Sequence, residues 1–256
     1  MDAKALGETK QRACQEIDRI ADCLWKIARD IHTNPETGWD TPLAVRWLTE
    51  PLRQAGFRTE IGVAGMTSAF LAEWSGGKSD RPTVALLAEY DALRGIGHGC
   101  GHNLIGSAAV GAGLAVKAAI PGLPGRIRVI GTPFEEGGGG KVILAEKGFF
   151  DSCDAAMMFH PNNRTMVLRG GLASVHIIFR YHGKASHAAA APEKGISALD
   201  AVLHLFFGVN QLRQFAPQGY RIHGVITQGG AAPNIVPEFA EAEFIVRATN
   251  RSHLVR

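Results

Sequence analysis

The chain has 256 residues, of which 46% are hydrophobic and 20% are charged, a balance typical of a folded globular protein with a sizeable core. Its formal net charge is only +3, and no run of lysine and arginine alternates with aromatic residues, so we expect no nucleic-acid partner. Four cysteines are too few for a disulfide framework, and no segment has the character of a signal peptide or membrane span. We therefore expect a cytoplasmic protein with no membrane partner.

The first part of the chain predicts helices, then strands, then an alternation of the two. Apolar residues recur at helical spacing in the helices, and the third strand is a nearly continuous apolar run, as in a fully buried strand. The expected elements are helices at 9–31 and 43–56, strands at 57–63, 67–74 and 83–90, a helix at 103–119, a strand at 126–132, a helix at 139–147 and a strand at 154–160. This order is typical of an α/β fold with a mostly parallel central sheet and helices on both faces.

The pattern changes near Gly170 and Gly171, where long amphipathic strands begin. The expected order is a strand at 172–183, a helix at 196–215, and strands at 220–230 and 237–249. This β-α-β-β order lacks the last two elements of the ferredoxin-like pattern. We therefore predict two domains, 1–170 and 171–256, and we expect the second to stop before it is complete.

Three successive strand ends of the first domain carry side chains that can bind a metal. They are Glu89, Asp91, His98, Cys100 and His102 after the third strand, Glu135 and Glu136 before four glycines after the fourth, and His160 at the end of the fifth. Reactive groups of open α/β sheets collect at the carboxyl ends of the strands, so we expect these loops to converge. Thiolate, imidazole and carboxylate are all ligands of zinc, and a catalytic zinc keeps one position open for water.

The spacing of these residues fits such a site. Cys100 and His102 flank a glycine and can face the same side of a tight turn. Glu135 and Glu136 are adjacent and point in different directions, so one can hold a metal while the other acts as a general base on water.

Structural explanations compete with the metal hypothesis for each residue taken singly. Cys100 could be an inert core thiol, and His160 a hydrogen-bonded histidine at a strand end. Glu135 and Glu136 could be solvated charges at a helix start, and the glycine run could be a flexible turn or a phosphate cradle, although it lacks the Lys-Ser/Thr of a P-loop. The coincidence of these residue types at three successive strand ends favours the metal.

Several motifs in sequence order resemble one known family. The segments "AEYDALRGIGHGCGHN", "PFEEGGGG", "FHP", "GKASHAAAAPEKGISALDA" and "GGAAPNIVPEFAEAEFIVR" are similar to those of the dinuclear-zinc aminoacylases, carboxypeptidases and amidohydrolases. The wording "EYDAL…GHGCGHN" is most similar to the branch of Xaa-Arg-type dipeptidases and aminobenzoyl-glutamate hydrolase. The resemblance implies a zinc-peptidase-like catalytic domain with an inserted ferredoxin-like α+β lid domain, both incomplete in this chain.

The resemblance also implies roles for individual residues. Cys100 would bridge two divalent ions, most readily zinc although manganese, cobalt or nickel would also suit the ligands, with His102, Glu136 and His160 as further ligands. Glu135 would be the general base, and Asp91 would orient a ligand histidine. In the lid, His187 and Asn234 would touch the substrate or its oxyanion across a homodimer interface, and Arg247 would pair with a substrate carboxylate.

The expected function is hydrolysis of an amide bond in a dipeptide or N-acyl-amino acid by metal-activated water. Two alternatives stay open: an inactive fragment of the same fold that binds a ligand or dimerises, and a thiol hydrolase with Cys100 as its nucleophile. The family's last metal-binding histidine would lie beyond Arg256, so we expect this chain alone to be poorly stable and weakly active or inactive.

Overall fold

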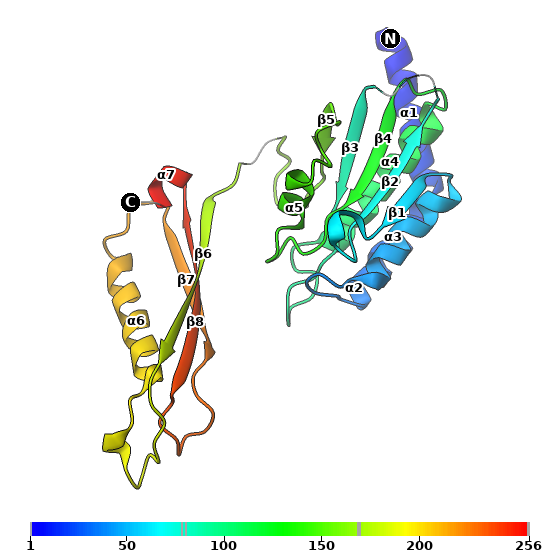
Figure 1. The fold of residues 1–256 in the computed structure, drawn as a ribbon. Helices are drawn as coiled ribbons and strands as arrows, with labels where there is room; N and C mark the ends of the chain where they lie inside the picture. The colour runs from blue at the N-terminus through cyan, green and yellow to red at the C-terminus, as the bar shows by residue number, and fades with distance from the viewer. Residues whose placement is uncertain (1, 78, 80, 168–169, 255–256) are drawn as a thin grey trace. The chain divides into compact units, whose positions relative to one another are not determined.

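The structure is a computed structural model that describes residues 2–77, 79, 81–167 and 170–254. It divides into two compact units, Met1–Arg164 and Thr165–Arg256 (Figure 1). The first unit combines helices with a central sheet, and the second packs a helix on a smaller sheet.

The helices of the first unit form early in the chain and after its central strands. They are α1 (Ala3–Arg19), α2 (Ala21–Thr33), α3 (Pro42–Gln54), the short 3₁₀ helix η1 (Val63–Gly65), α4 (His102–Ala119) and α5 (Gly140–Glu146). The single helix predicted over 9–31 is wrong, because the chain breaks at Ile20 (φ −100°, ψ 8°) into α1 and α2. Both helices contact α4, and the break lets each pack along it.

The central sheet has five strands in the order β1-β2-β4-β3-β5. Their bounds are β1 (Arg58–Ile61), β2 (Phe70–Ser75), β3 (Thr83–Ala88), β4 (Arg126–Gly131) and β5 (Ala155–Met157). Strands β4, β3 and β5 run parallel, as expected of strands joined through helices, whereas β1 and β2 join antiparallel at one side. The predicted α/β class is confirmed, with a sheet that is mixed.

Both faces of this sheet are buried, which explains the continuous apolar run of β3. Its even-numbered side chains, such as Leu86, pack into one core with α2, α3 and α4, and Ala85 packs into a second core with α5 and η1. Helix α4 lies so close to the sheet at Gly113 that a Cβ there would approach Val129 Cγ2 to 2.8 Å. The loops at the strand ends are therefore held by a rigid scaffold.

The second unit is a three-stranded antiparallel sheet in the order β6-β8-β7 with α6 on one face. Its elements are β6 (Ala173–His182), the 3₁₀ helix η2 (Pro192–Lys194), α6 (Ala198–Arg213), β7 (Arg221–Gln228), β8 (Phe239–Ala248) and α7 (Arg251–Leu254). The predicted β-α-β-β order is present. In the part of the chain that the structure describes, no helix combines the length and apolar character required to cross a membrane.

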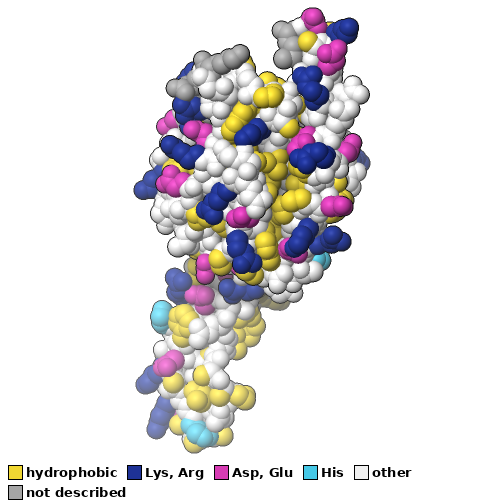
Figure 2. All heavy atoms as spheres, turned by 90° about the vertical axis from the view of Figure 1, so that its right-hand side faces the viewer, with side chains coloured by type: hydrophobic (Ala, Val, Ile, Leu, Met, Phe, Trp, Pro, Cys, Tyr) yellow, Lys and Arg dark blue, Asp and Glu magenta, His cyan; other side chains and the backbone are white. Residues whose placement is uncertain are grey.

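An apolar groove of about 660 Å³ lies on the first unit between α1, α2 and α4. Trp25, which is 60% exposed, and Phe159 are among the side chains that border it. Figure 2 shows the side of this unit that lies to the right in Figure 1, where hydrophobic side chains gather between charged ones. The predicted site residues do not line this groove, so the chemistry of the fold lies elsewhere.

Candidate metal centre

The carboxyl ends of the parallel strands bring the predicted ligands of the first unit together. Glu89 and Asp91 directly follow β3, His102 is the first residue of α4, and His160 follows β5. The turn after β4 supplies Glu135 and Glu136. Because β3, β4 and β5 are parallel neighbours, their following loops meet at one edge of the sheet.

His102 lies at the centre of this group and is only 1% exposed. Its Nδ1 donates a hydrogen bond to the backbone oxygen of Asp91 at 2.9 Å and lies 3.4 Å from Asp91 Oδ1. This arrangement leaves the lone pair of the neutral ring on Nε2, which is the form in which histidine binds metals. The Nε2 atom is buried and has no hydrogen-bond partner among the described residues.

Three carboxylates surround His102 Nε2. Glu89 Oε2 lies 3.3 Å away, and Glu135 Oε2 and Glu136 Oε1 each lie 3.7 Å away. Glu89 is itself 1% exposed, and its Oε2 has no hydrogen-bond donor among the described residues. Buried polar atoms are nearly always paired, so these two atoms fit the ligands of a cation.

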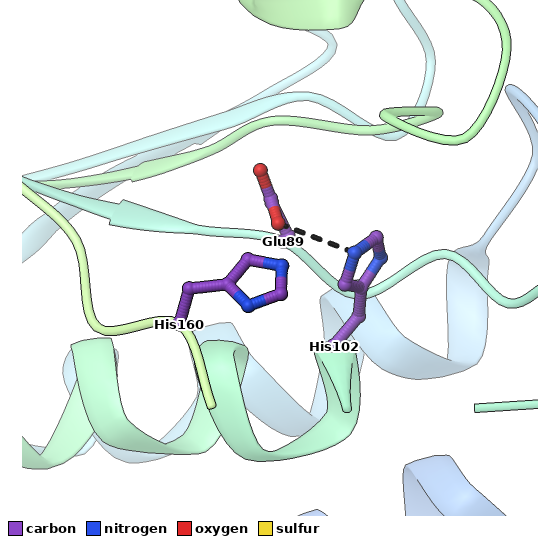
Figure 3. A group of neighbouring side chains, drawn as sticks. All are labelled: Glu89, His102 and His160. Carbon is purple, nitrogen blue, oxygen red and sulfur yellow. Dashed lines mark ion pairs between the residues drawn. The ribbon is translucent and has the colours of Figure 1, made fainter. Parts of the chain in front are cut away.

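Two overlapping groups could each hold a metal ion. One comprises Glu89, His102 and His160, shown in Figure 3, and the other comprises His102, Glu135 and Glu136. Within each group the ligand atoms all lie within 4.8 Å of one another. The His160 ring is nearly perpendicular to that of His102, at 6.0 Å between centroids, and its Nδ1 donates to the backbone oxygen of Pro161. Both histidines therefore keep Nε2 free toward the group.

Burial, hydrogen bonds and neighbouring charges shift the pKa values of the central residues. Burial lowers the pKa of His102, but hydrogen bonding to Asp91 and the nearby Glu89 outweigh it, so the net shift is upward. Burial raises the pKa of Asp91, yet hydrogen bonds from His102 and from the backbone of Glu136 and Glu135 bring it below its usual range. Asp91 Oδ2 accepts from Glu136 N at 3.1 Å, so one carboxylate ties the α4 loop to the β4 loop.

Glu135 has the properties of a proton acceptor beside this group. Its side chain is 42% exposed, unlike that of Glu89. Burial, followed by the charge of Glu89, raises its pKa above the ordinary value. The preceding residue, Phe134, has a positive φ of 52° and packs edge-on against Trp39, with ring centroids 5.0 Å apart. This strained, packed residue fixes the direction in which Glu135 leaves the turn.

Cys100 is half-buried at the rim of the same group. Its thiol hydrogen-bonds to Glu136, and this bond, with burial, raises the pKa of Cys100 to about 11. Neither of the two metal-binding groups found among the described residues includes its sulfur. A bound cation would reverse the local charge and deprotonate a coordinating thiol, so the predicted role of Cys100 as a ligand stays a prediction.

Glu89 is among the candidate side chains that the sequence places at the end of the third strand, but the family resemblance gives it no specific role. The ligand set that the resemblance implies comes from later positions. The sequence feature that points to Glu89 as a ligand is its position: it is a carboxylate directly after a fully buried strand, two residues before Asp91. Its Oε1 pairs with Lys141 and its Oε2 faces His102, which makes Glu89 a ligand candidate through Oε2.

The second unit brings two of its three predicted residues together. His187 pairs with Ile235 in an isolated bridge, and Ala188 N donates to Asn234 O at 3.0 Å, so His187 and Asn234 lie side by side. The His187 Nδ1 accepts from two backbone N–H groups, which leaves Nε2 as a donor. Arg247 lies near the other end of β8. It is eight residues beyond Phe239, the first residue of that strand and the one nearer Asn234 in the chain, which makes about 27 Å at roughly 3.4 Å per residue.

Comparisons with known proteins identify the family that this chain resembles. A family model described as a peptidase dimerisation domain of the M20 type matches residues 167–255. The Xaa-Arg dipeptidase of Mus musculus is 36% identical over 98% of this chain and 61% of its own length. A subunit of the p-aminobenzoyl-glutamate hydrolase of Escherichia coli is 39% identical over 87% of this chain and 50% of its own length. The chain thus spans between half and two thirds of the length of these relatives.

A solved structure supports the fold. The crystal structure of a dinuclear metal-binding peptidase of the M20 family from Bacillus subtilis aligns with a TM-score of 0.57 at 21% identity, covering 91% of this chain and 65% of that one. The similarity extends over both units, and the two curated relatives share more than a third of their aligned residues with this chain. The chain belongs to the M20 family of peptidases and is similar, within it, to Xaa-Arg dipeptidases and aminobenzoyl-glutamate hydrolases.

Proposed function

We propose that this chain carries the metal-binding part of a hydrolase that cleaves the amide bond of a dipeptide or an N-acyl-amino acid. The observation that carries the proposal is the buried pair His102 Nε2 and Glu89 Oε2, which lie 3.3 Å apart without a hydrogen bond, beside Glu135 and Glu136. With the imidazole neutral both atoms are acceptors, and each costs roughly 1–3 kcal/mol when it has neither a donor nor a cation. A divalent cation would satisfy both, and relatives named as a dipeptidase and a hydrolase support an amide substrate.

The proposed centre holds two divalent ions, with zinc as the first candidate. The residues that would hold the ions are those expected from the sequence together with Glu89. They are Glu89, Cys100, His102, Glu136 and His160. The mixture of sulfur, nitrogen and oxygen donors suits zinc, and metal analysis distinguishes it from manganese, cobalt or nickel.

The side chains divide the work of hydrolysis. Bound divalent ions would polarise the scissile carbonyl and lower the pKa of water. Glu135 accepts the proton of the attacking water on a carboxylate oxygen and returns it to the leaving nitrogen, which its raised pKa favours. Asp91 holds His102 through Nδ1 and Glu136 through its backbone N–H, so it is a positioning residue.

The second unit supplies the substrate contacts in this proposal. His187 Nε2 donates to the oxyanion beside Asn234, and Arg247 pairs with the substrate carboxylate. Because Arg247 lies at the far end of β8, a single small substrate cannot reach both positions on one sheet. We therefore propose a homodimer through this unit, in which His187 and Asn234 serve one site and Arg247 serves the other.

A cytoplasmic location is also part of the proposal. The four cysteines are free, and Cys14 and Cys23 are exposed. Exposed thiols persist where the cell keeps them reduced. A reducing compartment also protects Cys100 from oxidation when no metal is bound.

The thiol-hydrolase alternative is not favoured. A cysteine nucleophile needs a lowered pKa and a basic partner, usually histidine. Cys100 instead bonds to the carboxylate of Glu136, and its pKa is raised to about 11. A ligand-binding role without turnover is not favoured by the relatives, which are named as hydrolases.

The test compares metal binding and hydrolysis in three forms of the chain. Each form is stripped with a chelator, reloaded with zinc, and measured for zinc per chain and for cleavage of a panel of dipeptides and N-acyl-amino acids. The unmodified chain and His204→Ala, an exposed histidine of α6, are expected to bind zinc, and His102→Ala is expected to lose it. Equal zinc in all three forms, or none in any, contradicts the proposal.

A further inference from the structure

Lys141 forms a contact with the proposed centre that the mechanism does not use. It is the second residue of α5, and its ammonium forms an ion pair with Glu89 Oε1. The Lys141 side chain is 30% exposed, whereas that of Glu89 is 1% exposed. The same carboxylate therefore faces a lysine with one oxygen and His102 with the other.

Glu89 needs a positive neighbour because its surroundings are acidic. Glu135 and Glu136 lie around the same imidazole nitrogen, and a buried carboxylate without a counter-charge is strongly destabilising. Lys141 is the ammonium that contacts it. In the absence of a metal, this ion pair supplies the charge that a divalent cation would otherwise supply.

The pair also limits how Glu89 can bind a cation. One oxygen is held by Lys141, so only Oε2 faces the group that includes His102 and His160. A carboxylate held in this way offers a single oxygen. The ammonium is within a few ångströms of that oxygen, and like charges at such distances repel appreciably even at an effective dielectric of about 20.

We infer that Lys141 is a positioning residue that competes with the metal for Glu89: it keeps the empty site stable and weakens cation binding there. The inference rests on the proposed metal-dependent function. Lys141 thereby lowers the affinity of the centre for its ion, so that the ion exchanges more readily.

The test measures zinc affinity and stability in matched lysine variants. Lys141→Met removes the ammonium, and Lys147→Met is the control because Lys147 is exposed at the end of the same helix. Zinc affinity is measured by competition with a chromogenic chelator, and the thermal midpoint is measured with excess EDTA and with zinc. Lys141→Met is expected to bind zinc about tenfold more tightly, to melt earlier in EDTA, and to regain its stability with zinc.

Two further variants separate charge from packing. Lys141→Gln keeps a hydrogen-bond donor without the charge and is expected to show the same gain in affinity, which keeps the test valid if Lys141→Met folds poorly. The double variant Glu89→Gln/Lys141→Met removes both charges and is expected to lose the gain. A general packing defect would lower stability in all these forms without raising zinc affinity.

The outcomes distinguish this inference from the proposed function. If the unmodified chain binds zinc and neither Lys141→Met nor Lys141→Gln binds it more tightly than Lys147→Met, the inference fails and the function stands. If the unmodified chain binds no divalent metal, both fail.

Discussion

Replacing Gly140 with alanine is expected to destabilise the first unit by about 2 kcal/mol, within the range of about 1–3 kcal/mol for overpacking. A Cβ at this position would lie 3.2 Å from the carbonyl carbon of Pro133 and 3.3 Å from its Cδ, and closer still to its carbonyl oxygen. These are mostly backbone atoms of the turn before Glu135, so no side chain can rotate away. The turn must move, and with it the contact between Lys141 and Glu89.

The assay is thermal unfolding of the chain with excess EDTA, followed by circular dichroism. A loss of about 2 kcal/mol corresponds to a midpoint roughly 4–8 °C lower for a unit of this size. Gly7→Ala is the matched control: nothing lies within 4 Å of its added Cβ, and Gly7 is inside α1. That change is expected to be stabilising by up to about 1 kcal/mol. A Gly140→Ala midpoint at or above that of the unmodified chain would refute the packing argument.

Three further changes test the division of roles in the centre. Glu135→Gln is expected to keep zinc while whatever hydrolysis the unmodified chain shows falls by about 10²–10⁴-fold, measured as zinc per chain and rate on the same sample. Asp91→Ala is expected to weaken zinc binding by about tenfold, measured by chelator competition, because His102 loses the carboxylate beside Nδ1 and Glu136 N loses its acceptor, while the hydrogen bond from His102 to the backbone oxygen of residue 91 remains. Zinc is expected to slow alkylation of Cys100 by iodoacetamide and leave that of exposed Cys14 unchanged, measured by peptide mass spectrometry. Equal protection of both thiols would argue against ligation by Cys100.

Local patterns predicted most of the elements because each depends on residues close in sequence. The continuous apolar run of β3 indicates a strand buried on both faces, and the small residues of α4 indicate a closely packed helix. The structure buries most residues of both elements. The break between α1 and α2 was not predictable in this way. The apolar spacing continues across Ile20, and the break follows from how both helices contact α4.

The convergence of the candidate ligands was predictable from a general rule of parallel sheets. That rule alone places His102, His160 and the Glu135–Glu136 pair at one edge. The rule does not predict which of the carboxylates is buried. Which of them is buried depends on the angle at which each chain leaves its strand, and Glu89 leaves directly into the core.

The glycine run shows why the pairing of Lys141 with Glu89 was not predictable from the sequence. The run could have been a flexible turn or a phosphate cradle, but a Cβ at Gly137 would approach the Phe134 ring to 2.8 Å, and Gly139 has a positive φ of 65°. The glycines therefore let the chain fold back closely enough to start α5 beside the end of β3. The two charges are 52 residues apart in sequence and meet only in the folded chain. The glycines serve the proposed metal centre indirectly, by bringing a lysine to a carboxylate that would otherwise be buried without a counter-charge.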